Sequence, residues 1–129
     1  MLQDAVPAIV LKGIPTDVAN TDYALTIPQV GKGYTVRRVT AYNATGGSSA
    51  VATLSVWGST GGTGTAIVAD AALTTHTDAT IVSDRTIVAI GVMPVAAIVD
   101  DPVLYARIGT PSGVSGTKID LVVVIEPLP

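Results

Sequence analysis

The chain has 129 residues, a formal net charge of −3 and no cysteine, which predicts a single domain without a disulfide framework or a thiolate metal site. The acidic balance argues against nucleic acid as a partner, because phosphate binding depends on clustered Lys and Arg. The content of 19 Val, 11 Ile and 17 Thr against a single Glu favours strands over helices, since β-branched residues pack well in sheets.

The first two predicted strands lie near the N-terminus. Residues 8–12 are a short apolar run between a proline and a glycine, which indicates an edge strand. Residues 23–27 alternate larger apolar residues with smaller ones and form a second strand, which Pro28 ends. The N-terminal residues 1–13, MLQDAVPAIVLKG, lack a basic start followed by a long apolar run, so we expect no secretory signal.

The central prediction is a β-hairpin formed by residues 34–57. Two strand-like runs, YTVRRVTAYN and AVATLSVW, flank the Gly/Ser-rich segment ATGGSS, a pattern typical of a hairpin. Val36 and Val39 are an odd number of residues apart, so they share a face only if the strand contains a bulge. Such a bulge would lie at Arg37 and Arg38, whereas a regular strand would place these two arginines on opposite faces.

The glycine-rich stretch GSTGGTGT, residues 58–65, is predicted to be an exposed loop. It superficially resembles a phosphate-binding loop, but it lacks the lysine and the following helix that such a loop requires. Residues 66–70 fit a short strand, which residues 71–73 either extend or end with one helical turn. Residues 80–88 are strand-like again.

Residues 86–99 contain no charged side chain. The stretch is too short for a transmembrane helix, and Gly91 and Pro94 would break one, so we expect no membrane partner. Its apolar residues suit either an extended part of the sandwich or a contact between copies of the chain. For such a contact, the candidate interface residues are Arg37, Arg38, Val92, Met93, Val95 and Ile98.

The last two predicted strands are residues 103–108 and 118–126. Tyr105 and Arg107 share one face of the first strand. The second is apolar on both faces, as a central strand requires. The total of about eight strands predicts an all-β fold, an antiparallel β-sandwich or jelly roll. One domain would cover residues 1–129, with short extended arms at residues 1–7 and 126–129.

Residue patterns that predict catalysis are missing from the sequence. His76 is the only histidine, and Asp78 beside it does not complete a ligand set for a metal. Asn43 begins a glycosylation triplet, a weak signal without a secretory signal. Asp100 and Asp101 precede a proline, where aspartate favours a turn. We therefore expect no enzymatic activity, no cofactor and no metal site.

Two segments carry a resemblance to a known class of proteins. They are YTVRRVTAYNATGGSSAVATLSVWGS and VLYARIGTPSGVSGTKIDLVVVIEPLP. Together they resemble small structural proteins from the virions of tailed bacteriophages, particularly trimeric capsid decoration or cement proteins. The resemblance is one of general style, a sandwich rich in Thr, Val, Ala and Gly, and not of a fixed motif. No functional residue is therefore carried over.

The resemblance implies a homotrimer that is made in the bacterial cytoplasm and binds the major capsid protein on the virion surface. The composition agrees, because charged residues make up 13% of the chain against about 25% in ordinary soluble domains. One alternative is another virion component, such as a head fibre or tail protein. Another is a carbohydrate-binding sandwich module, which would expose some of the aromatic residues Trp57, Tyr23, Tyr34, Tyr42 and Tyr105.

Overall fold

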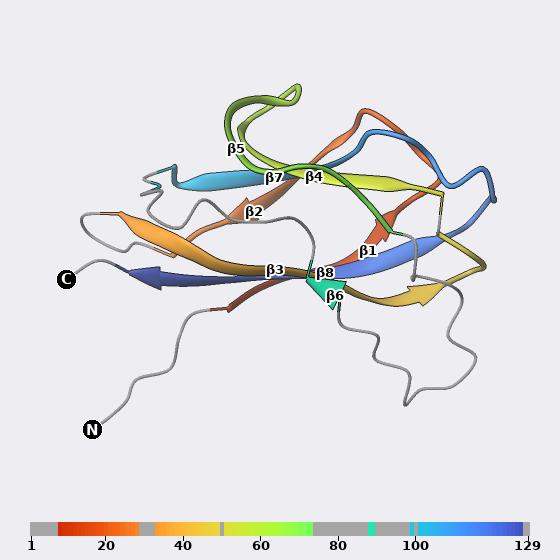
Figure 1. The fold of residues 1–129 in the computed structure, drawn as a ribbon, viewed down its shortest axis with the longest axis horizontal. Coiled ribbons are helices and arrows are strands. Elements are labelled where there is room, and N and C mark those ends of the chain that lie inside the picture. The colour runs from red at the N-terminus through yellow and green to blue at the C-terminus, as the bar shows by residue number, and fades with distance from the viewer. Residues whose placement is uncertain are drawn as a thin grey trace.

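Two four-stranded antiparallel sheets pack face to face in the structure, a computed structural model that describes residues 8–28, 33–49, 51–73, 88–89, 99 and 101–127 (Figure 1). The first sheet has the order β1-β8-β3-β6 and the second has the order β2-β7-β4-β5. The strands of the first sheet are β1 (Ala8–Pro15), β8 (Lys118–Pro127), β3 (Tyr34–Thr45) and β6 (Val88–Ala89). Those of the second are β2 (Asp22–Thr26), β7 (Val103–Ile108), β4 (Thr53–Ser59) and β5 (Thr63–Ala72).

The pairing of these strands is that of a jelly roll. β1 pairs with β8, β2 with β7, β3 with β6 and β4 with β5, as in one long antiparallel ribbon that folds back at the β4–β5 turn. Successive strand pairs of the ribbon alternate between the two sheets, so the ribbon rolls around a shared core. The predicted all-β sandwich or jelly roll of about eight strands is confirmed.

The predicted hairpin of residues 34–57 is wrong. β3 and β4 lie in different sheets, and the Gly/Ser-rich segment between them crosses from one sheet to the other. At the start of this crossover Gly46 has a φ of 77° and packs closely against the loop before β8. A Cβ at Gly46 would lie 2.2 Å from the carbonyl oxygen of Gly116. The direction of this segment is therefore set by the contact between Gly46 and Gly116, which are far apart in the sequence. The local turn residues, which predicted a hairpin, do not decide it.

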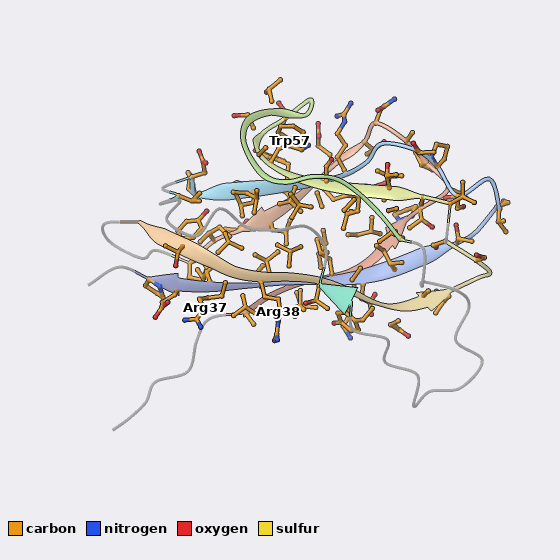
Figure 2. The ribbon with its side chains drawn as sticks, in the orientation of Figure 1. Arg37, Arg38 and Trp57 are labelled. Atoms are coloured by element: carbon orange, nitrogen blue, oxygen red, sulfur yellow. The ribbon has the colours of Figure 1, made fainter. Side chains whose placement is uncertain are left out.

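Of the two possibilities for β3, a regular strand or a bulge at Arg37 and Arg38, the structure has the bulge. The pairing register with β8 shifts between Val36 and Arg38. As a result Val36 and Val39 are both buried, with 6% and 2% of their surfaces exposed. Arg37 and Arg38 are exposed on the outer side of the sheet (Figure 2).

Most other predicted strands are confirmed, with changed ends. Residues 8–12 belong to β1, an edge strand that continues to Pro15. The strand predicted at 118–126 is β8, which lies between β1 and β3 and runs through Pro127, so residues 126–127 do not belong to a terminal arm. Residues 71–72 extend β5 and form no helical turn. Residues 1–7 lie outside the described residues.

The glycine-rich stretch 58–65 is mostly strand, so the prediction of a loop throughout is wrong. β4 continues to Ser59 and β5 begins at Thr63, which leaves residues 60–62 as the turn of a tight hairpin. The β4–β5 hairpin curls above the outer face of the second sheet (Figure 1).

Four buried hydroxyl groups close one end of the sandwich. Thr16 Oγ1 lies 2.7 Å from Ser49 Oγ and donates to Thr117 Oγ1 at 2.6 Å. Thr117 Oγ1 lies 2.7 Å from Ser112 Oγ. Thr16 follows β1, Ser49 lies between β3 and β4, and the other two residues link β7 to β8. This hydroxyl chain therefore ties together three segments that each cross between the sheets.

Replacing Gly46 with alanine should destabilise the fold far more than replacing Gly113. Their φ angles are 77° and 78°, so the left-handed backbone costs an alanine about 1–2 kcal/mol at either position. Only Gly46 has a neighbouring backbone atom in the way, because nothing lies within 4 Å of a Cβ at Gly113. Thermal unfolding should show a small loss for G113A and a large loss, or failure to fold, for G46A. Equal losses would contradict the close packing at Gly46.

Candidate functional site

The described residues show no grouping that could hold a metal ion. Among them, no three His, Cys, Asp or Glu side chains come together. Within the same residues, no helix has the length and hydropathy needed to span a membrane. Since the core between the sheets is filled by buried apolar side chains, the candidate sites are the outer faces of the two sheets.

The structure describes two of the six predicted interface residues, Arg37 and Arg38. The predicted residues that lie outside the described part of the chain are Val92, Met93, Val95 and Ile98, together with His76, Asp78 and Asp100. Within the uncharged stretch 86–99, the structure describes residues 88–89 and Val99, and these belong to the sandwich. β6 pairs with β3, and Val99 is 2% exposed and exchanges two backbone hydrogen bonds with Tyr34. A contact between copies through the rest of the stretch stays a prediction.

The outer face of the first sheet carries exposed apolar residues. In the register of β1 and β8, Val10 lies beside Val122 and Ala8 lies beside Val124. Val10 is 48% exposed, Ala8 is exposed, and the two β8 valines are half-buried. We call these four residues the valine face. A sheet face that meets only water usually carries polar residues, so the valine face suits contact with another apolar surface.

Two arginines border the valine face. Arg38 lies beside Val124 in the register of β3 and β8, and both arginine side chains point away from the core (Figure 2). Arg37 Nη1 donates to Glu126 Oε1 at 2.8 Å, but the two side chains are 57% and 53% exposed, so this ion pair contributes little stability. Arg38 is exposed and forms no ion pair with the other described residues, which leaves its charge available to a partner.

Asp120 holds the strands on both sides of β8 in irregular conformations. Its Oδ1 accepts a hydrogen bond from the Gly13 backbone N–H and its Oδ2 accepts one from Asn43 Nδ2, both at 2.9 Å. Gly13 and Asn43 have positive φ angles of 69° and 55°, and each lies at a register shift. The Asn43 amide is thus engaged within the sheet, which argues against its use as a glycosylation acceptor.

Tyr42 lies opposite Asp120 on the same face. Burial, and to a smaller extent the negative charge of Asp120, raise the pKa of Tyr42 above its ordinary value of 10.0. Both causes act against the phenolate, because burial disfavours charge and a nearby carboxylate repels a second negative group.

The outer face of the second sheet is different, because it carries aromatic and charged side chains. Tyr105 and Arg107 share this face, as predicted, and Trp57 lies beside Tyr105 in the register of β4 and β7. Arg107 Nη1 donates to Asp22 Oδ1 at 3.0 Å, and the backbone N–H of Gly61 donates to Asp22 Oδ2 at 3.0 Å. Trp57 lies close to the curled β4–β5 hairpin (Figure 2). We call Trp57, Tyr105, Arg107 and Asp22 the aromatic face.

Comparison of the chain with protein-family models, curated proteins and solved structures finds no match. The two outer faces are therefore the features of this chain that bear on its function.

Sequence reasoning missed two of the polar arrangements on these faces. Asp120 is a single acidic residue in the otherwise apolar run IDLVVVI, and that isolation was a usable signal for a structural carboxylate. The ion pair of Asp22 and Arg107 gave no such signal, because it depends on the register between β2 and β7, two strands far apart in the sequence.

Replacing Asp120 with alanine should cost about 3 kcal/mol of unfolding free energy, because two sheltered hydrogen bonds to a charged group are lost. Asp120 is only 7% exposed, so its hydrogen bonds are shielded from water. Glu126→Ala on the same strand is the matched control and should cost less than about 1 kcal/mol, since it removes an exposed ion pair. Urea denaturation measures both. Similar costs for the two variants would mean that Asp120 does not organise the bulges.

In an alkaline titration followed by ultraviolet absorbance, Tyr42 should ionise above its ordinary pKa of 10.0. Because folding raises its pKa, the neutral phenol contributes stability that is present below pH 10 and is lost as pH rises through the folded pKa. Asp120→Asn should lower this pKa only partly, since burial is the larger cause. The difference between the titrations of the unmodified protein and of Tyr42→Phe isolates the ionisation of Tyr42, and a midpoint at or below pH 10 would contradict the raised pKa.

Proposed function

We propose that the protein is a capsid decoration protein of a tailed bacteriophage, which binds the outside of the head as a trimer and stabilises contacts between capsid subunits. The observation that carries the proposal is the valine face, an apolar outer surface on a chain with few charges. The jelly roll is compatible with this role, because such folds occur in viral capsid and lectin domains. A fold alone does not determine function, so the argument rests on the surface.

The valine face supplies apolar contact area for a capsid subunit. Val10 leaves 48% of its surface exposed, and covering it contributes about 1 kcal/mol. The half-buried valines of β8 extend the same surface across the sheet. An apolar contact of this kind requires no fixed sequence motif. The resemblance to decoration proteins likewise rests on the general residue content and not on a motif.

Charge and backbone pairing add specificity to this contact. Arg38 beside the valine face suits an acidic side chain of the capsid, because guanidinium groups form strong hydrogen bonds with carboxylates. β1 lies at the edge of the first sheet, so one side of its backbone can pair with an extended segment of a neighbour. The proposed partner is thus an acidic, partly apolar surface of the major capsid protein.

The proposed mechanism involves no chemical reaction, cofactor, nucleic acid or membrane. A decoration protein binds the assembled lattice better than free subunits, and each occupied site stabilises the shell by RT ln(1 + [L]/Kd). Three copies that bind together gain further affinity through their linkage. The low proportion of charged residues, 13% of the chain, suits a protein whose surface is largely covered by neighbours.

Val10→Asp should strongly reduce occupancy on emptied, undecorated phage heads, because it places a charge within the apolar contact. The matched control is Val51→Asp, a change at a valine that is 67% exposed and lies between β3 and β4, away from the valine face. Val10→Thr keeps the β-branched shape and should have an intermediate effect. Occupancy is measured by cosedimentation with heads, and circular dichroism verifies folding.

Equal occupancy of Val10→Asp and Val51→Asp would contradict the role of the valine face. Sedimentation of the unmodified protein tests the trimer separately, and a monomer at micromolar concentration would restrict the trimer to the capsid-bound state. Failure of the unmodified protein to bind any head would contradict the proposed function itself.

A further inference from the structure

We infer that the aromatic face of the second sheet is a binding site for a neutral oligosaccharide. Trp57 and Tyr105 form its stacking surface, and Arg107 and Asp22 supply its polar contacts. This inference does not depend on attachment to a capsid, because it concerns the sheet opposite the valine face.

Trp57 and Tyr105 lie beside each other on neighbouring strands, with small residues beyond them. Along one row of the sheet, the paired residues are Ala24 with Tyr105, Tyr105 with Trp57, and Trp57 with Ala66. Both alanines are exposed and both aromatic residues are partly exposed. Because a methyl group is much shorter than an aromatic ring, the rings stand above their neighbours on either side. They therefore form a raised, two-ring apolar surface.

A raised aromatic pair is better suited to binding a sugar than to binding the flat surface of another protein. The apolar C–H groups of a pyranose pack against an aromatic ring, while its hydroxyl groups need polar partners at the ring edge. Adjacent strands are about 4.8 Å apart, so rings on neighbouring strands can engage consecutive units of an oligosaccharide. Tyr and Trp combine a large apolar area with a polar group, which suits such amphipathic ligands.

The next row of the same face provides hydrogen-bonding groups. Arg107 pairs in register with Asp22 on one side and Ser55 on the other. The Arg107–Asp22 ion pair holds both side chains in place, and they remain 19% and 22% exposed. Arg107 has five N–H donors, of which one donates to Asp22. The remaining donors, and the free lone pairs of Asp22, are available to sugar hydroxyls.

The ion pair also indicates a neutral ligand. The positive charge of Arg107 and the negative charge of Asp22 lie together and offset each other, so the face has no excess charge with which to select an anion or a cation. Paired charges of this kind still form strong hydrogen bonds with hydroxyl groups.

The β4–β5 hairpin forms one wall of the site, and two glycines of its turn lie nearest to the site. Asp22 anchors the Gly61 backbone, and an added Cβ at Gly62 would lie 3.8 Å from both Trp57 Nε1 and Arg107 Nε. These two glycines have φ angles of 75° and 70°, where glycine is favoured. The glycines of the turn thus lie close to the Trp57 ring and to Arg107 without a side chain of their own between them.

Trp57 is the only tryptophan in the chain, so its fluorescence reports directly on the site. Cellotriose, maltotriose and chitotriose are the probes. At least one should change the emission saturably, with a Kd in the millimolar range that is usual for a small weak contact. Saturation-transfer NMR on the same sugars provides a second readout that does not depend on tryptophan emission.

Tyr105→Ala should weaken binding at least tenfold, whereas Tyr105→Phe keeps the ring and should bind within about twofold of the unmodified protein. Tyr42→Ala, on the outer face of the other sheet, is the control and should bind normally. Thermal unfolding verifies that each variant is folded. Absence of a saturable signal from all three sugars in both measurements would overturn the inference, as would unchanged binding by folded Tyr105→Ala.

Discussion

The chain of hydroxyl groups that joins Ser49, Thr16, Thr117 and Ser112 is the interaction on which the rest of the structure depends. A ribbon rolled into two sheets must cross between them at the ends, and the crossing segments bury polar groups that need partners. Here the hydroxyl groups of three crossing segments form hydrogen bonds with one another, with oxygen–oxygen distances of 2.6–2.7 Å. Two backbone hydrogen bonds, from the Thr16 N–H to the Thr117 carbonyl and from the Ser112 N–H to the Thr16 carbonyl, reinforce them. Loss of one hydroxyl would leave buried neighbours unsatisfied, at a cost of about 1–3 kcal/mol.

With the sheets fixed in this way, their outer faces point in opposite directions and differ in chemistry. The face around Val10 is apolar, bordered by arginines, and suited to a broad protein contact. The face around Trp57 has two aromatic rings and a neutral ion pair, and is suited to a small polar ligand. On the proposed capsid, the first face would meet the lattice and the second would face the medium. Because the two sheets share a core but not a surface, the proposed attachment and the proposed recognition would use separate faces.

The features that could be predicted from the sequence are those that depend on the alternation of side chains between the two faces of one strand. The odd spacing of Val36 and Val39 marked the place where a bulge in β3 was possible, and the period of two placed Tyr105 and Arg107 on one face. The crossover after β3 could not be predicted, since a Gly/Ser-rich turn serves a hairpin and a crossover equally well, and the contact that decides between them joins Gly46 to a loop far along the chain. For the same reason the sequence did not reveal that Trp57 lies beside Tyr105. That pairing depends on how the ribbon rolls and not on the local pattern.

The central claim is that the protein binds a head through the outer face of the β1-β8-β3-β6 sheet. Cryo-electron microscopy of heads decorated with the protein tests it most directly. The predicted map places Val10, Val122 and Arg38 against the capsid lattice, with the β4–β5 hairpin pointing away from the head. A map in which the hairpin contacts the lattice and the valine face is open to solvent would contradict the claim.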